Sequence, residues 1–258
     1  MEDPRFLAAA DRLGLLVWAE IGSAYAFSTG AVRDLVTEWM RAVVQQRSHP
    51  SVVCWVPFNE SWGVEDLARF PQQREFVRGL TALTRALDGS RPVVSNDGWE
   101  HVDSDIVGVH DYAADPDVLQ SRYGSNAGML HTITGPGPQG RRIAATEAQE
   151  SRLQDGSTPI VLSEFGGISL TSDCDTWGYS SAGGADGLRH RLSRLFGVVN
   201  SLAPLAGYCY TQLTDTLQEA NGLLWPDRTP KLPIEEIRAI VTGELNQAAP
   251  TTTVLAVV

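Results

Sequence analysis

The alternation of uninterrupted apolar runs with amphipathic helical stripes constrains the fold of this chain more than any other feature. Residues 52–56 are all apolar, which a strand exposed to water on one face would not be. A stripe of apolar residues at helical spacing precedes this run, between Val32 and Val44, and a second stripe follows Pro71. Strands that are apolar on both faces are typical of a parallel sheet covered by helices. The sequence therefore predicts the α/β class.

Six runs have the character of buried strands, and helical patterns lie around them. The second helix is expected to begin at Ser28 or Thr29 as its N-cap, and the third at Pro71. The link between the third and fourth strands is shorter than the dozen residues that a parallel crossover normally needs. We expect strands within residues 15–18, 51–58, 91–94, 105–110, 159–162 and 206–213, and further helices from residue 3, over 188–199 and over 233–241.

Two architectures fit this pattern: an open doubly wound sheet and a (β/α)8 TIM barrel. An open sheet usually has a glycine-rich turn after its first strand, and the segment that begins at Glu20 lacks that motif. Polar and aromatic residues gather just after the strand ends, where barrels build their active sites. We therefore predict a barrel over residues 1–244 that is N-terminally incomplete, with about six of eight strands present. Residues 245–258 are expected to form a loosely structured tail.

Composition excludes several classes of function. The chain of 258 residues has 20 Lys and Arg against 31 Asp and Glu, a net charge of −11, which disfavours a nucleic-acid partner. No apolar stretch reaches the roughly 18 residues of a membrane span. The three cysteines form no CxxC pair or His/Cys cluster, and we expect no metal or cofactor. The first residues do not resemble a signal peptide, which favours a cytoplasmic location.

Two segments carry a glutamate where an apolar strand opens into a glycine-containing loop. Glu60 lies in Phe-Asn-Glu-Ser-Trp-Gly, and Glu164 lies in Ser-Glu-Phe-Gly-Gly. Cleavage of a glycosidic bond needs two carboxyl groups, one protonated and one ionised, and their environments must keep these states apart. The alternative is that each glutamate caps the next helix or pairs with an arginine. The pair of contexts favours the catalytic interpretation.

These two segments resemble the paired motifs of glycoside hydrolase family 2, which includes β-galactosidases, β-glucuronidases and β-mannosidases. Residues 10–18, 210–215 and 218–224 resemble that family too, so the likeness runs from about residue 3 to residue 231. The resemblance implies a retaining mechanism with a covalent glycosyl-enzyme intermediate. Glu60 would be the acid/base on the fourth barrel strand, and Glu164 the nucleophile on the seventh. Their carboxyl groups would then lie about 5–5.5 Å apart.

The resemblance also implies roles for three further groups of residues. Asn59 would hydrogen-bond the sugar 2-hydroxyl, and Tyr112 would contact the nucleophile. On the last strand, one of two alternating sets must face the barrel axis. The family pattern favours the set with Tyr210 and Gln212 near the sugar.

Position alone suggests five weaker candidates for substrate binding. His110 ends a strand and either binds a sugar hydroxyl or serves as a structural hydrogen-bonding group. Trp177, in the loop 176–179, is harder to explain as a core residue and is expected to stack on a sugar face. Glu20, Asn96 and Asp97 end strands, and each either lines the pocket or acts as a cap or turn residue.

These residues are compatible with three alternative functions. The first is a retaining exo-β-glycosidase module acting on a galactoside, a glucuronide or a related sugar. The second is a catalytically inactive truncated barrel that binds carbohydrate or another protein. The third is an open-sheet enzyme such as an esterase, which the lack of a Gly-x-Ser-x-Gly elbow disfavours. Besides a carbohydrate, the expected partners are the β-sandwich domains that precede the barrel in whole family members, or a second copy of the chain.

Overall fold

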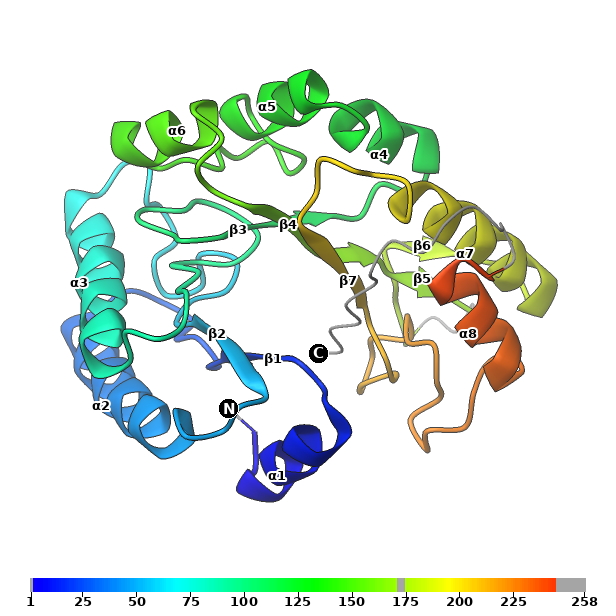
Figure 1. Cartoon of the computed structure of the whole chain (residues 1–258), viewed down its shortest axis with the longest axis horizontal. Coiled ribbons are helices and arrows are strands. Elements are labelled where there is room, and N and C mark those ends of the chain that lie inside the picture. The colour runs from blue at the N-terminus through cyan, green and yellow to red at the C-terminus, as the bar shows by residue number, and fades with distance from the viewer. Residues whose placement is uncertain (1, 171–174, 245–258) are drawn as a thin grey trace. The chain divides into compact units, whose positions relative to one another are not determined.

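The computed structural model describes residues 2–170 and 175–244 (Figure 1). These residues divide into two compact units. Unit 1 comprises residues 1–110 and 130–163, and unit 2 comprises residues 111–129 and 164–258. The boundary between the units falls within β3 (Val107–Asp111), α5 (Asn126–Thr134) and β4 (Ile160–Gly166). The tail predicted over 245–258 lies outside the described residues.

Unit 1 opens with the helices and strands that its apolar pattern predicts. The Ser28 hydroxyl accepts a hydrogen bond from the Ala31 amide at 3.1 Å, which caps the second helix as expected. Pro71 occupies the first turn of the third helix, where its missing N–H is not needed. The first two strands pair in parallel. The elements are α1 (Pro4–Leu13), β1 (Val17–Glu20), α2 (Thr29–Gln46), β2 (Val52–Val56), α3 (Pro71–Leu87) and α6 (Glu147–Gln154).

The strand predicted over 91–94 is wrong as a continuous strand. Val93 forms a single parallel bridge with Trp55 of β2, and the Trp55 amide donates to the Pro92 carbonyl at 3.1 Å. Pro92 has no N–H to donate, so a regular ladder cannot pass through it. The segment nevertheless follows β2, because the Asp97 amide donates to the Phe58 carbonyl at 2.8 Å. It continues through residues 95–104 as an irregular loop, which explains the short link to β3.

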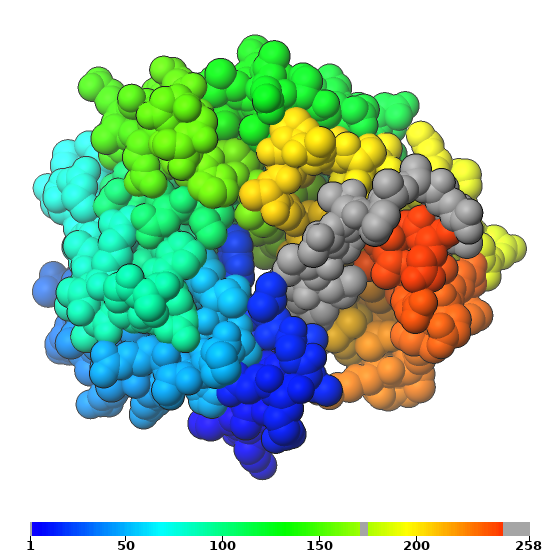
Figure 2. All heavy atoms as spheres, in the orientation of Figure 1, coloured from blue at the N-terminus to red at the C-terminus, as the bar shows by residue number. Residues whose placement is uncertain are grey.

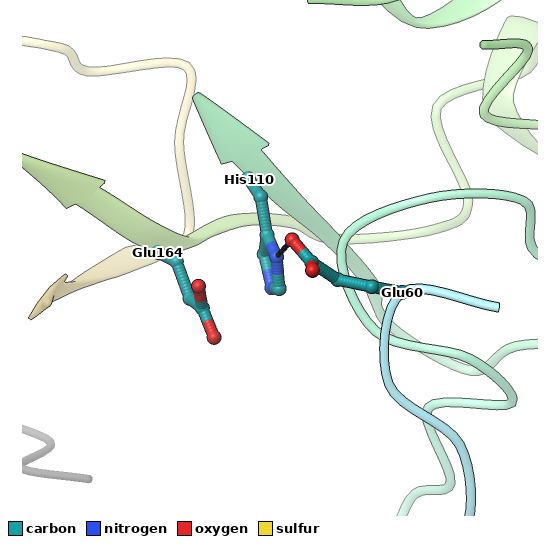
Figure 3. Close-up of side chains that lie close together, drawn as sticks. All are labelled: Glu60, His110 and Glu164. Atoms are coloured by element: carbon teal, nitrogen blue, oxygen red, sulfur yellow. Dashed lines mark hydrogen bonds and ion pairs between the residues drawn. The ribbon is translucent and has the colours of Figure 1, made fainter. Parts of the chain in front are cut away.

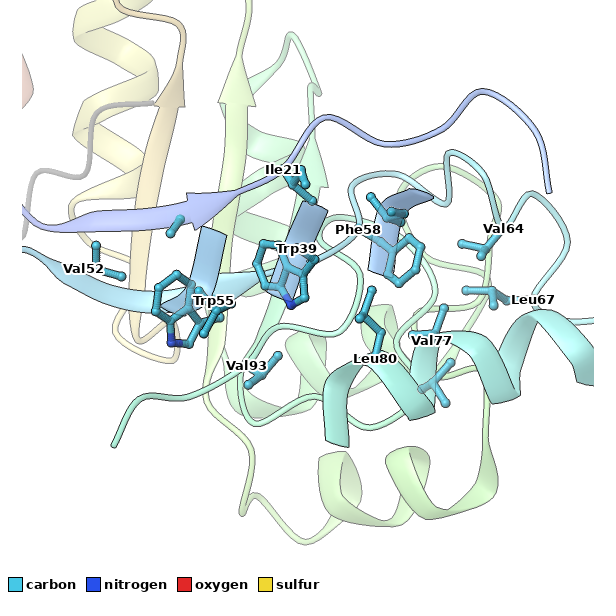
Figure 4. Packing of buried hydrophobic residues seen from close by; sticks show 14 of the residues in the cluster. Ile21, Trp39, Val52, Trp55, Phe58, Val64, Leu67, Val77, Leu80 and Val93 are labelled. Atoms are coloured by element: carbon cyan, nitrogen blue, oxygen red, sulfur yellow. The ribbon is translucent and has the colours of Figure 1, made fainter. Parts of the chain in front are cut away.

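A fully buried aromatic core supports the end of β2 (Figure 4). Trp39 of α2 meets Trp55 edge to face, with the ring centroids 6.0 Å apart. Both indole N–H groups have partners, because Trp39 donates to the Thr84 hydroxyl at 2.7 Å and Trp55 donates to Asp88 at 2.9 Å. Large rings whose polar atoms are satisfied give a rigid base. In the space-filling view α2 and α3, blue to cyan, lie side by side on the surface of unit 1 (Figure 2).

Unit 2 is built around Phe165 of β4, which meets Phe196 at a centroid distance of 5.6 Å and Tyr208 at 5.7 Å. Three short helices of the chain, α4, α5 and α6, were not predicted. The α6 sequence Glu-Ala-Gln-Glu-Ser-Arg-Leu-Gln has no apolar stripe, so periodicity does not reveal it. The elements of unit 2 are α4 (Pro116–Tyr123), β5 (Ile168–Ser169), β6 (Ser180–Ser181), α7 (Ala185–Val199), β7 (Gly207–Thr211) and α8 (Ile234–Thr242).

The α/β class and the parallel pairing agree with the predicted fold class. The described strands form a two-stranded sheet β1-β2, a three-stranded sheet β3-β4-β7 and a two-stranded sheet β5-β6. They do not close into one continuous barrel, so the number of barrel strands stays a prediction. Among the described residues, the helices are all too short or too polar to cross a bilayer.

Candidate active site

Glu60 lies on a strained turn that follows β2. Both Glu60 and the next residue, Ser61, have left-handed backbones, with φ of 49° and 57°. Residues with a side chain rarely adopt this conformation, and a turn that holds two of them must be fixed by its surroundings. The Glu60 amide donates to the Asp97 carbonyl at 2.9 Å, and the Ser61 amide donates to Asn96 Oδ1 at 2.9 Å. The segment 96–97 therefore holds the turn that presents Glu60.

A buried polar network lies beneath this turn. The Ser61 hydroxyl donates to Glu100 Oε2 at 2.5 Å, and Asn96 Nδ2 donates to the Ser61 hydroxyl at 3.0 Å and to the Glu100 carbonyl at 2.9 Å. Arg141 Nε pairs with Glu100 Oε1 at 2.9 Å. Asn96 is fully buried, and its amide is engaged on both sides. Of the two alternatives for Asn96, this placement favours the turn residue over a residue that lines the pocket.

The Glu60 carboxyl contacts a buried imidazole (Figure 3). His110 Nδ1 lies 2.8 Å from Glu60 Oε1, and His110 Nε2 lies 3.3 Å from Asp97 Oδ2. The other oxygen of Asp97 accepts a hydrogen bond from the Ser163 hydroxyl at 2.8 Å. Burial alone would raise the pKa of Asp97, but the hydrogen bonds from His110 and Ser163 and the charge of His110 lower it. Asp97 is thus kept as an anion behind His110.

Two glycines make room for this Asp97–His110–Glu60 chain. A Cβ atom on Gly98 would lie 2.3 Å from His110 Nδ1, and one on Gly108 would lie 1.6 Å from Asp97 Oδ1. A side chain at either position would clash with His110 or Asp97 and disrupt this series of contacts. These glycines were not predicted as functional residues. Asp97 was expected, like Asn96, either to line the pocket or to act as a cap or turn residue, and its contact with His110 depends on how residues 95–104 fold.

Glu164 is in β4, and its carboxylate accepts a hydrogen bond from the Tyr112 hydroxyl. The contact that the resemblance implied for Tyr112 is therefore present, while the nucleophilic role of Glu164 stays a prediction. Burial, then the charge of Glu164 and the hydrogen bond to it, raise the pKa of Tyr112 far above its ordinary value. Tyr112 consequently remains a neutral donor to Glu164.

The Gly-Gly pair after Glu164 leaves space for aromatic rings. Gly166 and Gly167 have φ of 93° and 58°, which suits glycine. A Cβ atom on Gly166 would lie 2.2 Å from the Tyr210 ring, and one on Gly167 would lie 2.4 Å from the Tyr179 ring. Tyr179 in turn stacks on Tyr112, with centroids 3.4 Å apart and planes 2° from parallel. The glycines thus allow the ring packing that orients the donor to Glu164.

Of the predicted site residues in the loops of unit 2, Trp177 is the most exposed. Its side chain is 42% exposed and meets Tyr179 edge to face at 5.4 Å. Tyr210 is half-buried, with its hydroxyl 3.5 Å from the Asn221 carbonyl, and burial raises its pKa. Gln212 Nε2 donates to Asn221 Oδ1 at 2.9 Å. Tyr210 and Gln212 therefore hold the loop that reaches residue 221, whereas Trp177 is open to a ligand.

Glu20 and Asn59 end neighbouring strands of unit 1. Glu20 is half-buried at the end of β1, opposite Val56 of β2. The Asn59 amide N–H of the backbone donates to the Ser23 hydroxyl at 3.4 Å. Its side-chain oxygen is buried and, among the described residues, accepts no hydrogen bond. An acceptor left in this state costs about 1–3 kcal/mol unless a ligand or water donates to it.

Comparisons with known proteins bear on this arrangement. Residues 2–172 match the family described as glycosyl hydrolases family 2, TIM barrel domain. No curated protein matches the sequence significantly. The solved structures that it resembles include an FMN-binding β-glucuronidase from Facaelibacterium prausnitzii L2-6, with 15% identity and a TM-score of 0.64 over 89% of this chain and 35% of that one.

Two further solved structures are similar. Bacteroides uniformis β-glucuronidase 2, bound covalently to cyclophellitol-6-carboxylate aziridine, shares 17% identity with a TM-score of 0.61 over 96% of this chain and 30% of its own. The β-glucuronidase from Ruminococcus gnavus in complex with uronic isofagomine shares 15% identity with a TM-score of 0.61 over 91% of this chain and 42% of its own. The chain thus spans less than half the length of each. At these identities the likeness shows the fold.

Proposed function

The chain belongs to glycoside hydrolase family 2 through its TIM barrel domain, and on that premise we propose that it carries the catalytic site of a retaining exo-β-glycosidase. The observation that carries the proposal is the contrast between its two strand-end glutamates. Glu60 contacts an imidazole that is backed by a buried carboxylate, whereas Glu164 contacts a neutral phenol. A retaining mechanism needs one carboxyl group that exchanges a proton and one that stays ionised.

In the first step Glu164 attacks the anomeric carbon while Glu60 protonates the leaving oxygen. The aglycone departs, and a glycosyl ester of Glu164 remains. Glu60 is then ionised, and His110 at 2.8 Å is placed to donate to it. When both ring nitrogens donate, one to Glu60 and one to Asp97, the imidazole is cationic, and Asp97 on its far side stabilises that charge.

In the second step Glu60 takes a proton from water, which attacks the anomeric carbon and releases Glu164. Tyr112 donates to Glu164 throughout the cycle and holds its carboxylate in one orientation. Asn59, whose buried side-chain oxygen accepts no hydrogen bond from the described residues, is the residue that we assign to the sugar 2-hydroxyl. No step in this mechanism requires a cofactor. The separation of about 5–5.5 Å between the two carboxyl groups remains a prediction.

The sugar is proposed from the relatives and the sequence together. The three similar structures are described as β-glucuronidases, and the sequence motifs are equally those of β-galactosidases. Glucuronides and galactosides are therefore the first substrates to test. As in whole family members, further domains or a second copy of the chain are proposed as partners that complete the substrate pocket.

The test is hydrolysis of 4-nitrophenyl β-glycosides, with the released sugar followed by proton NMR. A retaining enzyme releases the β-anomer first, and the α-anomer grows in later by mutarotation. Release of the α-anomer first would contradict the retaining mechanism. Sugar binding by folded protein without hydrolysis of any glycoside would instead support the carbohydrate-binding alternative.

A further inference from the structure

An exposed aromatic pair lies beside the Glu60 turn and has no part in the mechanism above. Trp62 follows Glu60 by two residues and is 48% exposed. Tyr25, in the loop between β1 and α2, is 86% exposed. The two rings meet edge to face, with centroids 6.0 Å apart and planes 83° from parallel. Both residues belong to unit 1.

Trp62 is exposed although the turn that carries it is held in the core on both sides. The residues on either side of it, Ser61 and Gly63, are buried. Phe58 and Val64, which flank the whole turn, are fully buried in the core of unit 1 (Figure 4). The chain thus leaves the core, presents one large ring to solvent and returns. A loose loop would not alternate burial and exposure in this way.

The loop that carries Tyr25 is fixed against the same turn. The Asn59 amide donates to the Ser23 hydroxyl at 3.4 Å, and the Phe27 amide donates to Glu65 Oε1 at 2.9 Å. The two loops also touch at Gly63, where a Cβ atom would lie 2.9 Å from the Ala24 carbonyl oxygen. Contacts on both sides of Tyr25 therefore hold its ring next to Trp62.

The position of the pair identifies what it would bind. A general acid donates its proton to the leaving-group oxygen, so the leaving group must lie against the residue that acts as acid. The Cα atoms of Glu60 and Trp62 are at most about 7.6 Å apart, because two trans peptide units join them. A ring attached to that oxygen would therefore lie near the turn that exposes Trp62.

We infer that Tyr25 and Trp62 form the aglycone-binding subsite of the site proposed above. The pair takes a leaving group that presents a flat ring with an apolar face, either an aryl ring or a pyranose. Glu65 and Asp66 lie three and four residues after Trp62, and the chain carries a net charge of −11, so an uncharged leaving group is favoured over an anionic one. The inference rests on the proposed function, because it takes Glu60 as the acid.

The test measures binding rather than turnover. In the full chain with Glu164→Gln, NMR titration gives the Kd of 4-nitrophenyl β-D-galactoside, of lactose and of methyl β-D-galactoside, and of the 4-nitrophenyl and methyl glucuronides. Trp62→Ala is expected to raise the Kd of the nitrophenyl glycoside by about 3- to 10-fold, the typical value of one aromatic contact, and to leave the methyl glycoside unchanged. Trp62→Phe should restore part of the loss. Phe70→Ala is the matched control, since Phe70 is 44% exposed on the same unit.

The outcomes separate the subsite from the proposed function. A loss that is confined to nitrophenyl glycosides identifies an aryl subsite, and a loss that includes lactose identifies one for any flat ring. Equal effects of Trp62→Ala on nitrophenyl and methyl glycosides, an equal effect of Phe70→Ala, or the absence of binding would overturn the inference. If the selective loss is found but the unmodified chain hydrolyses nothing, the subsite stands and the proposed function fails. If the unmodified chain hydrolyses glycosides but Trp62→Ala causes no selective loss of binding, the proposed function stands and the subsite fails.

Discussion

Glu60 and Glu164 both lie where an apolar strand opens into a loop, but their surroundings hold them by different means. The Glu60 turn has two left-handed residues, and buried polar groups such as Asn96 and Glu100 fix it. Glu164 lies on a regular strand, and the loop beyond it is shaped by glycines under stacked aromatic rings. Hydrogen bonds therefore fix the Glu60 turn, whereas aromatic packing shapes the loop that follows Glu164.

The difference extends to the groups that touch each carboxyl. The partner of Glu60 is His110, which can bind or release a proton, and Asp97 behind it can stabilise the imidazolium. The partner of Glu164 is Tyr112, whose raised pKa keeps its proton in place. The two regions therefore suit the two roles of a retaining mechanism, one that exchanges a proton and one that does not.

The largest expected effect comes from Glu164. Glu164→Ala removes the proposed nucleophile, and we expect kcat to fall by about 10^4- to 10^6-fold, as for other covalent catalysts. Added azide should then attack the anomeric carbon directly and give the α-glycosyl azide, which NMR identifies. A β-glycosyl azide from this variant would show that the roles of the two glutamates are exchanged.

Removal of Glu60, the proposed acid/base, should have a smaller effect that depends on the leaving group. Glu60→Ala is expected to lower kcat/KM by about 10^2- to 10^4-fold for a poor leaving group, the usual contribution of general acid catalysis. For a 2,4-dinitrophenyl glycoside, which needs no protonation, the loss in the first step should largely disappear. Azide should give the β-glycosyl azide here. Equal losses for both leaving groups would contradict the assignment.

Acid should destabilise unit 1 through His101. Burial lowers the pKa of His101 to about 4, outweighing its hydrogen bond to the Gly108 carbonyl, against an ordinary value near 6.5. Between these pH values the unfolded chain binds a proton at His101 that the folded chain does not bind. The free energy of unfolding therefore falls as the pH drops from about 6.5 to 4. The loss reaches about 3 kcal/mol and then levels off.

Unfolding free energies measured by denaturant at several pH values check this expectation. His101→Gln should flatten the slope between pH 6.5 and 4. The exposed His190 on α7 offers a matched control, and His190→Gln should leave the slope in place. An unchanged slope in His101→Gln would mean that another group is responsible. Because Gly108 precedes His110 by two residues in β3, activity should be lost along with stability.

The smallest effect tests the packed region. Tyr112→Phe removes the hydrogen bond to Glu164 but keeps the ring that stacks on Tyr179. A hydrogen bond to a charged group contributes about 1.5–3 kcal/mol to stability, so the melting temperature should fall by a few degrees. Because the hydroxyl also orients Glu164, kcat should fall by about 10-fold. Tyr179→Phe retains the stack and serves as the control. A large drop in melting temperature for Tyr112→Phe alone would indicate a structural role for its hydroxyl.

The sequence predicted the parts of this molecule that depend on local patterns. Local sequence patterns predicted the helices α2, α3 and α7 from their apolar stripes. They also predicted the strand ends at Glu60 and Glu164. The strand at 91–94 was misjudged because Pro92 interrupts its ladder. The buried network of Asn96 and the contact between His110 and Glu60 join residues 35 and 50 positions apart, so they depend on the tertiary fold.

The most direct test of the central claim is mass spectrometry after incubation with 2-deoxy-2-fluoro β-glycosides of galactose and glucuronic acid. The fluorine slows the second step, so a retaining enzyme accumulates its glycosyl ester. We predict one adduct on the intact chain, located on the peptide that contains Glu164, and its absence in Glu164→Gln. An adduct on Glu60 or on any other residue would contradict the assignment of the two glutamates, and soluble folded chain that forms no adduct with any sugar would contradict its competence as an enzyme.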